Sequence, residues 1–386
     1  MKVVGLFAGI GGFEVGLRRA GHQAILTCES WAPAQAVLKS RLDGVPNHDD
    51  VKTLKDLPAD TELLCAGFPC QDLSQAGKTA GIDGLRSSLV GEVFRLLDSR
   101  PVPWVVLENV SFMLHLDRGR AMERLVSALE ERGYRWAYRV VNSLAFLPQR
   151  RQRVFFVATR DSDPADVLLG EDNGSRIRST RLDTHAHGFY WTEGVRGLGW
   201  APDAVPTLKN GSTVGIPSPP AILMPDGNII QPDLRDAERL QGFDEDWTEP
   251  AAEVGRASMR WSLVGNAVSV PVVEWLGSRL RTPPGYSREL DKPMPASGQW
   301  PQAARYDGGK RFSVEVSGFP IWRERRPLHR YLRHPGRLLS ERATAGFLAR
   351  AESSSLRLIT PEFKARIRSH LTAMRSGSAF SCLAAE

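Results

Sequence analysis

The stretch Phe7-Ala8-Gly9-Ile10-Gly11-Gly12 decides the fold that we expect for this chain. It follows an apolar run, Lys2 to Leu6, typical of a short buried strand, and precedes a helical pattern from Phe13 to Ala20. Glycines between a first strand and a first helix let the backbone approach a ligand closely, and the amide groups at the helix start favour polar or anionic groups. Many nucleotide-binding folds share such a loop, so it predicts an α/β fold and a ligand site without naming the ligand.

Two acidic residues follow the next expected elements. A second strand, His22 to Thr27, leads to Glu29, about 20 residues beyond the glycines, where nucleotide-binding folds place an acid on ribose hydroxyls. Asp50 follows the next turn and could accept a hydrogen bond from an adenine amino group. The alternatives are ordinary helix-start positions, Glu29 in the pattern that follows it and Asp50 as the cap of Val51 to Leu57.

A single cysteine stands at the end of a third apolar run. Glu62 to Phe68 predicts a buried strand, and Pro69 should end it because proline fixes φ and removes a backbone donor. Cys70 would then lie at the carboxyl end of a strand, where open α/β sheets place their ligands. The alternative is a small buried hydrophobe, the commonest environment of a free cysteine.

Two more strand ends carry charged residues. Val102 to Leu107 predicts a strand that ends at Glu108, and a strand parallel to the one before Cys70 would bring this carboxyl group to the same pocket. Arg151 and Arg153 alternate at the start of an apolar strand, so period-two geometry would point both guanidiniums one way. The alternatives are a helix-capping glutamate and surface arginines.

These stretches, taken together, resemble the motifs of cytosine-C5 DNA methyltransferases. The motifs occur in order from about Val3 to Leu276, roughly seven-tenths of the chain. They are Phe7 to Phe13, Gly67-Phe68-Pro69-Cys70-Gln71 with Ser74 and Gly77, Glu108-Asn109-Val110, Gln149-x-Arg151-x-Arg153, Arg239-Leu240-Gln241-Gly242-Phe243 and Leu263 to Val268. Two positions depart from the family: Gly5 stands where Asp is usual, and Ser30-Trp31 where an aromatic residue before Asp is usual.

The resemblance implies a role for each matching residue. The catalytic group would be Cys70, Glu108, Arg151 and Arg153. S-adenosylmethionine would be bound by Phe7, Gly9, Gly11, Gly12, Glu29, Asp50, Leu89 and Asn266. The substrate would be contacted by Pro69, Gln71, Ser74, Arg86, Asn109 and Gln149. The Arg239 to Phe243 motif would be largely structural, and the final motif would return to the first domain.

Chemistry explains why these residue types are needed together. C5 of cytosine is a poor nucleophile, so methylation needs a thiolate to add at C6, the role implied for Cys70. Glu108, when protonated, would donate to N3, and Arg153 would hold the base O2. The cytosine must be flipped out of the duplex because a stacked base is inaccessible.

The expected fold is a Rossmann-like α/β methyltransferase domain with additions. We expect a catalytic and cofactor-binding domain over 1–159, a short target-recognition region and return segment over 160–234, and closing motifs over 235–280. A Pro-rich linker and basic C-terminal domain would cover 281–386. Within that domain, Arg311 to Val316 predicts a strand, and Ser340 to Ala351 and Pro361 to Met374 predict helices, with Pro361 in a first turn.

The distribution of charge indicates which class of partner the chain binds. The net charge is +6, yet residues 281–386 carry 19 Lys and Arg against 9 Asp and Glu, a net of +10, which leaves −4 for the rest. A basic surplus in one segment favours a polyanion, so we expect double-stranded DNA as partner and the C-terminal segment as a source of DNA contacts. A solvated basic face, or a packing or partner-binding appendage, is the alternative. A cognate restriction or defence-system protein is a further candidate partner.

The four cysteines, Cys28, Cys65, Cys70 and Cys382, have no metal-binding spacing, and no run of residues is long and apolar enough to span a membrane. We therefore expect a cytoplasmic protein without metal, disulfides or a membrane segment. Two other functions remain open: the same chemistry on RNA such as tRNA, and a catalytically silent DNA-binding protein. A transferred group larger than methyl also remains open.

Overall fold

The computed structural model describes residues 1–69, 88–177, 179–193, 197–209, 219–294, 299–353 and 359–377. The chain forms two compact units, and each is made of several segments. Unit 1 comprises Met1–Ala145, Gln152–Ser175 and Ala267–Trp322. Unit 2 comprises Phe146–Arg151, Arg176–Asn266 and Arg323–Glu386.

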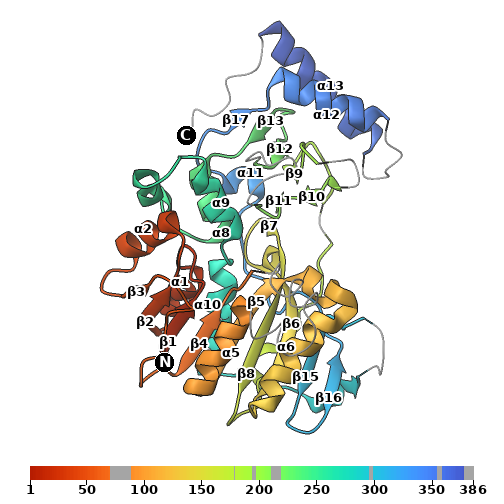
Figure 1. The fold of residues 1–386 in the computed structure, drawn as a ribbon. Coiled ribbons are helices and arrows are strands. Elements are labelled where there is room, and N and C mark those ends of the chain that lie inside the picture. The colour runs from red at the N-terminus through yellow and green to blue at the C-terminus, as the bar shows by residue number, and fades with distance from the viewer. Residues whose placement is uncertain are drawn as a thin grey trace. The chain divides into compact units, whose positions relative to one another are not determined.

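Unit 1 is built on a ten-stranded sheet with the order β14-β16-β15-β6-β8-β5-β4-β1-β2-β3 (Figure 1). Strands β1 to β5 run parallel to one another, whereas β8 lies antiparallel to both of its neighbours, β5 and β6. The strands are β1 (Lys2–Leu6), β2 (Gln23–Cys28), β3 (Asn47–His48), β4 (Leu63–Ala66), β5 (Trp104–Val110), β6 (Arg135–Asn142), β8 (Gln152–Thr159), β14 (Asp291–Pro293), β15 (Ala303–Tyr306) and β16 (Arg311–Val314).

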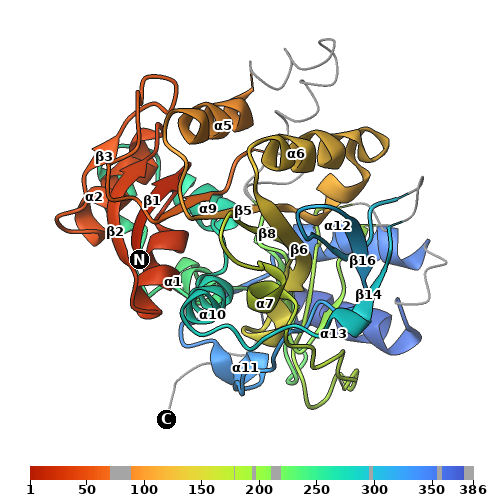
Figure 2. The same cartoon turned by 90° about the horizontal axis from the view of Figure 1, so that it is seen from below.

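Helices cover both faces of this sheet, as Figure 2 shows from below. On one face α5 (Leu89–Ser99) and α6 (Arg120–Glu131) join a large apolar core with the side chains of Val4, Leu64 and Val105. On the other face lie α1 (Gly12–Arg19), α7 (Ala165–Leu168) and α10 (Val270–Arg281). Unit 1 also holds α2 (Ala32–Arg41) and the 3-10 helices η1 (Ser111–Gly119), η2 (Ser143–Ala145) and η5 (Arg288–Leu290). This three-layer arrangement is the expected Rossmann-like fold.

Helix α10 returns the chain to unit 1 beside α1. At Gly16 an added Cβ would lie 2.6 Å from Val273 Cβ, so the two helices touch where glycine leaves room. His22 Nε2 also lies 2.9 Å from the carbonyl oxygen of Gly277. The chain thus returns to unit 1 through α10, whereas most of the predicted final motif, Leu263 to Asn266, belongs to α9 in unit 2.

Unit 2 holds a five-stranded antiparallel sheet with the order β10-β9-β12-β13-β17. Its strands are β9 (His187–Phe189), β10 (Ala201–Pro202), β12 (Ala221–Leu223), β13 (Ile229–Gln231) and β17 (Arg337–Leu338). A separate parallel pair joins β7 (Gln149–Arg150) to β11 (Val205–Pro206). The helices are α8 (Leu234–Gln241), η4 (Glu249–Glu253), α9 (Met259–Asn266), α11 (Leu328–Tyr331), α12 (Glu341–Glu352) and α13 (Pro361–Ser376).

Both faces of the small sheet are buried. Along β12, Ala221 and Leu223 pack into a core with residues of α12 and α13, whereas Ile222 packs with residues of α8, α9 and α11. Successive residues of a strand face opposite sides, so one short strand serves two cores. The sheet therefore needs helices from both its own region and the C-terminal segment.

The expected C-terminal domain, 281–386, is divided between the two units. Residues up to Trp322 belong to unit 1 because β15 pairs antiparallel with β6 and extends the main sheet. Residues from Arg323 belong to unit 2, where β17 pairs with β13. The expected recognition region, 160–234, is likewise divided, since 160–175 belongs to unit 1.

Several expected elements are present with small shifts. Helix α12 begins one residue after its predicted start, and α13 begins at its predicted start. Pro361 occupies the first turn of α13. Over the described ranges, no helix has the length and apolar character needed to cross a bilayer, and no group of three or more His, Cys, Asp or Glu could hold a metal ion.

Candidate active site

Four strands of unit 1 end at the same edge of the sheet. Leu6, at the end of β1, is in register with Cys28 on one side and Ala66 on the other, and Ala66 is in register with Leu107. The glycine loop, Glu29 and the chain leading to Cys70 follow the ends of β1, β2 and β4, and Glu108 lies in the last part of β5. Parallel pairing therefore brings together most of the segments that the sequence singled out.

The glycine loop is a tight left-handed turn. Phe7, Gly9 and Gly11 have positive φ angles of 54°, 56° and 84°. The loop is tied to the end of β2 by the amide of Ala8, which donates to the carbonyl oxygen of Cys28 at 3.1 Å. A phenylalanine in this region is strained, and such strain is concentrated at functional sites.

Glu29 holds this loop in place. Its Oε2 accepts a hydrogen bond from the amide of Gly9 at 2.8 Å, and its Oε1 accepts one from the amide of Trp31 at 2.8 Å. No atom lies within 4 Å of a Cβ added to Gly9, so the backbone there borders open space. An open backbone next to a fixed carboxylate suits a nucleoside cofactor.

The chain before Cys70 is fixed by the neighbouring strand. The buried side chain of Asn109 donates through Nδ2 to the carbonyl oxygen of Phe68 at 3.0 Å. Pro69 follows and is exposed. Glu108 Oε2 lies 3.5 Å from a Cβ added to Gly67, so the carboxyl group reaches toward this turn. Cys70, Gln71, Ser74 and Arg86 lie outside the described residues.

Glu108 is paired with Arg153. Arg153 Nε lies 3.0 Å from Glu108 Oε1, and the two side chains are only 15% and 12% exposed. The pair forms because β8 lies antiparallel to β5, which places Arg153 opposite Val110. A carboxyl group and a guanidinium thus converge at the edge where the cysteine loop begins, as the sequence predicted for these two residues.

Known proteins resemble this chain in sequence. The C-5 cytosine-specific DNA methylase family matches residues 1–187. The Type II methyltransferase M2.BsuMI of Bacillus subtilis is 47% identical over 365 residues, which cover 91% of this chain and 93% of that protein. The chain belongs to the cytosine-C5 DNA methylase family. The recognition, the fold class and the enzyme class predicted from the sequence are confirmed.

Other relatives are more distant. The Type II methyltransferase M.DsaV of Dactylococcopsis salina is 26% identical over 313 residues, covering 72% of this methylase and 86% of that protein. Among solved structures, the Dnmt2 methyltransferase of S. pombe matches with a TM-score of 0.52 at 18% identity, covering 72% of this chain and 98% of that one. At this identity the likeness concerns the fold alone.

The other residues predicted to bind the cofactor lie in a turn and at the ends of three helices. Asp50 Oδ1 accepts a hydrogen bond from the amide of Lys52 at 2.9 Å, and a turn follows in place of the helix considered above. Gly12 is the first residue of α1, and Leu89, the first residue of α5, packs against the core of unit 1. Asn266 ends α9 in unit 2 with an exposed side chain. Their cofactor contacts remain predictions.

Arg151 differs from the expectation that it would act beside Arg153. Its side chain is 1% exposed and donates to backbone carbonyl oxygens of unit 2, that of Leu208 at 3.0 Å and that of Gly265 at 3.2 Å. Period-two alternation applies within one continuous strand, but β7 ends at Arg150 and β8 begins at Gln152. In this geometry Arg151 links the backbone at Leu208 to the backbone at Gly265.

Gln149 has a similar environment inside unit 2, and its contact with the substrate stays a prediction. It is fully buried, its Nε2 donates to Leu240 O at 2.7 Å and Gln241 Oε1 at 3.1 Å, and its Oε1 accepts from the amide of Leu208 at 3.1 Å. Gln241 in turn donates to Val264 O at 2.7 Å. A buried amide must satisfy its own polar groups, so Gln149 is committed to the interior.

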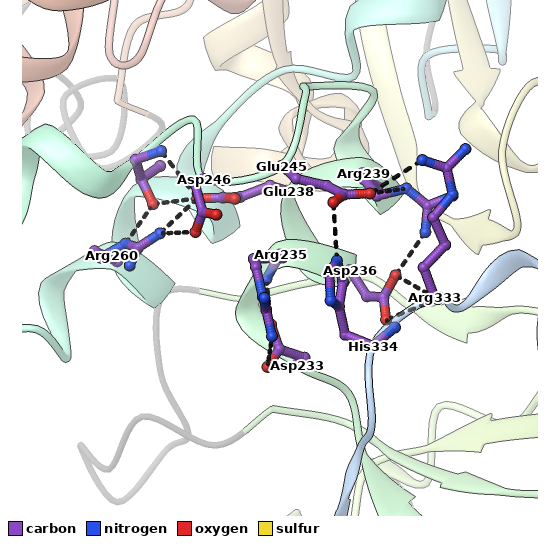
Figure 3. A network of polar contacts seen from close by, with 11 residues as sticks. Asp233, Arg235, Asp236, Glu238, Arg239, Glu245, Asp246, Arg260, Arg333 and His334 are labelled. Atoms are coloured by element: carbon purple, nitrogen blue, oxygen red, sulfur yellow. Dashed lines mark hydrogen bonds and ion pairs between the residues drawn. The ribbon is translucent and has the colours of Figure 1, made fainter. Parts of the chain in front are cut away.

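Helix α8 carries a second polar network that sequence reasoning missed (Figure 3). The fully buried Asp236 accepts hydrogen bonds from Arg239 Nη1 at 2.6 Å and from the backbone amides of Arg333 and His334. Glu245 pairs with Arg333 at 3.0 Å and with His334 at 3.1 Å. Asp236 on α8 and Glu245 shortly after it thus hold the C-terminal segment.

The two described cysteines have environments unsuited to a nucleophile. Cys28 and Cys65 are both buried. Burial raises the pKa of Cys28 to about 12 and that of Cys65 well above its usual value. A nucleophilic cysteine needs its thiolate, so neither residue competes with Cys70 for that role.

Proposed function

We propose that this chain methylates C5 of a flipped-out cytosine in double-stranded DNA through a covalent bond between Cys70 and C6. The observation that carries the proposal is the Glu108–Arg153 pair, 3.0 Å apart at the sheet edge from which the Cys70 loop departs. Family membership and the DNA methyltransferase relatives support the same reaction. We place it in the cytoplasm, where thiols stay reduced.

The cofactor of this proposal is S-adenosylmethionine. Its binding residues would be the glycine loop and Glu29, because Gly9 borders open space and its amide is oriented by the Glu29 carboxylate. The first turn of α1 adds backbone amides at the same place. When bound, S-adenosylmethionine supplies an electrophilic methyl group on a positively charged sulfur.

The protein residues prepare the cytosine ring. The Cys70 thiolate adds to C6, which moves electron density to C5. Glu108, carrying a proton, donates it toward N3 as negative charge develops on the ring, while Arg153 orients Glu108 and holds the base O2. Once C5 carries the methyl group, a base removes the C5 proton, Glu108 takes its proton back from N3, and the thiolate leaves C6 as the aromatic ring is restored.

DNA carrying 5-fluorocytosine tests this step, because fluorine at C5 prevents elimination of the thiolate and traps the adduct. The wild-type protein should give a denaturation-resistant complex with such DNA, and Cys70→Ser should give none and no turnover. Cys28→Ala is the control, since that thiol is buried and should leave trapping intact. Trapping or full activity in Cys70→Ser would contradict the mechanism.

The nucleic acid and the transferred group are tested in the same preparation. Methyl incorporation into duplex DNA should exceed that into tRNA, which would otherwise indicate an RNA enzyme. Mass spectrometry of digested product DNA should show 5-methylcytosine and no larger group. Absence of incorporation into either nucleic acid would indicate a catalytically silent binding protein.

We also infer that unit 2 is a target-recognition unit completed by the C-terminal segment. The support is the edge strand β17, which pairs Leu338 with Ile230, and the layer of α12 and α13 over the small sheet (Figure 1). Exposed Arg326, Arg330 and Arg342 have no ion pair among the described residues and could neutralise phosphates.

Charge reversal tests this inference better than truncation. Deleting residues from Pro284 onward would remove strands from both sheets, so lost DNA binding could reflect unfolding. The triple variant Arg326→Glu, Arg330→Glu and Arg342→Glu should fold and should lower the dependence of DNA affinity on salt, by about 0.9 in the logarithmic slope per lost phosphate contact. Lys310→Glu, an exposed change in unit 1, is the control. If the salt dependence of DNA affinity is unchanged in the triple variant, these arginines do not contact DNA phosphates.

A further inference from the structure

A buried carboxyl group lies beside β1, the strand that leads into the glycine loop. Glu14, in the first turn of α1, is 2% exposed, and neither of its carboxyl oxygens has a hydrogen-bond partner among the described residues. A buried polar group without a partner costs free energy, so it calls for a functional explanation.

The space for this carboxyl group comes from Gly5. A Cβ added to Gly5 would lie 1.8 Å from Glu14 Oε1 and 3.0 Å from Glu14 Cδ, so any other residue at position 5 would displace the side chain. The space beside Gly5 is therefore filled by the carboxyl group that α1 supplies.

The groups around Glu14 are acidic or uncharged. Cys65 on β4 is near Gly5, at 3.7 Å from the added Cβ, and Glu29 at the end of β2 acts on Glu14 by charge repulsion. On α10, the residues that face α1 at Gly16 are Val270 and Val273. Burial is the main cause that raises the pKa of Glu14 to about 7; its own backbone amide opposes the shift, and the charge of Glu29 adds a smaller rise. Near neutral pH this carboxyl group is therefore divided between its protonated and its ionised form, and a cation bound nearby would favour the ionised form.

We propose that Glu14 is a positioning residue that, when ionised, favours the cationic methyl donor over its uncharged thioether product. This rests on the proposed function, in which the loop binds S-adenosylmethionine. The donor and S-adenosylhomocysteine share every other charged group and differ by one methyl group and one positive charge on sulfur. A buried carboxylate acts on that charge with little screening, so it discriminates between the two where surface charges do not.

The sign of the pH effect follows from the raised pKa. Below about pH 6 Glu14 is protonated and the preference is absent, whereas above about pH 8 it is ionised and the preference is full. The ratio of the product Kd to the donor Kd should therefore rise on the order of threefold to tenfold across this window. Donor binding near pH 7 should release protons, because the bound cation stabilises the ionised form.

Calorimetry on the full-length protein tests this without relying on catalysis. Donor and product are titrated separately at about pH 6 and about pH 8, in two buffers of different ionisation enthalpy. The variant Glu14→Gln should bind both ligands with a ratio that no longer changes with pH. Glu131→Gln, an exposed change on α6, should keep the wild-type dependence.

Each outcome bears on one claim. A flat ratio in the wild-type protein, or a wild-type pH dependence in Glu14→Gln, would overturn the role of Glu14. If neither ligand binds the wild-type protein, the cofactor assignment itself fails. If thermal melting shows that Glu14→Gln does not fold, the role of Glu14 is tested by the pH dependence of the Kd ratio in two other proteins. These are the wild type and the double variant Gly5→Asp with Glu14→Leu. That double variant moves the carboxyl group from the helix to the strand and should show the pH dependence again.

Discussion

Truncating Phe363 should unfold unit 2 selectively. Phe363 lies on α13 and is 0% exposed. Its ring meets that of Trp200 at 4.7 Å and that of Phe189 at 5.3 Å between centroids, both edge to face, and that of Phe347 at 6.2 Å. The substitution Phe363→Ala removes this ring from the centre of the core between α12, α13 and the small sheet.

The expected loss can be worked out from this environment. A buried Phe→Ala change costs about 3–5 kcal/mol from lost transfer free energy and the remaining cavity. Two favourable aromatic pairs, each worth about 0.5–1.5 kcal/mol, place this site toward the upper part of that range. A loss of about 4 kcal/mol corresponds to roughly a thousandfold increase in the open population of the unit.

Hydrogen exchange measured by mass spectrometry can localise this loss. Amides of β12, β13 and β17 should exchange about a thousandfold faster in Phe363→Ala, while those of β1 and β4 keep wild-type rates. The matched control is Phe112→Ala, since Phe112 is 61% exposed and its loss should change neither sheet. Equal exchange in the variant and the wild type, or acceleration confined to α13, would refute the claim that the C-terminal helices complete the core of unit 2.

Three further changes test other contacts. Arg153→Ala should lower kcat about 100- to 1000-fold in methyl-transfer assays because Glu108 loses its partner, while donor affinity measured by calorimetry stays constant; an unchanged kcat would contradict the role of the pair. Gly16→Ala should cost about 1–3 kcal/mol of unfolding free energy in thermal melts, since the added Cβ would press on α10; a neutral effect would mean that the helices separate freely. Asp236→Asn should cost about 3 kcal/mol in urea unfolding because a buried charge with a cationic and two amide partners is lost; a loss below about 1 kcal/mol would contradict its structural role.

Much of the active site could be predicted because its parts are local. The glycine loop, Glu29 and Glu108 each follow directly on an apolar run that forms a strand, and parallel strands place their ends at one edge. The pairing of Glu108 with Arg153 also follows from neighbouring strands of one sheet. In the C-terminal segment, Pro361 and the helical spacing after it were enough to predict α13.

The sequence left the environment of a residue open where its polar pattern had more than one possible partner. Gln149 and Arg151 lie in the same short motif as Arg153, yet both are committed to backbone groups around Leu208. A motif of alternating residues does not say where one strand ends and the next begins. The break between β7 and β8 is set by the pairing of β7 with β11, more than fifty residues along the chain.

The sequence alone therefore determined the strand-to-loop order, the residue types at the strand ends and the basic character of the C-terminal segment. Only the tertiary structure decided that this segment is split between two units, that β17 and helices α12 and α13 complete the small sheet, and that Gly5 makes room for Glu14. The physical reason is that turns and periodicity act over a few residues, whereas the choice among apolar surfaces to bury depends on segments distant in sequence.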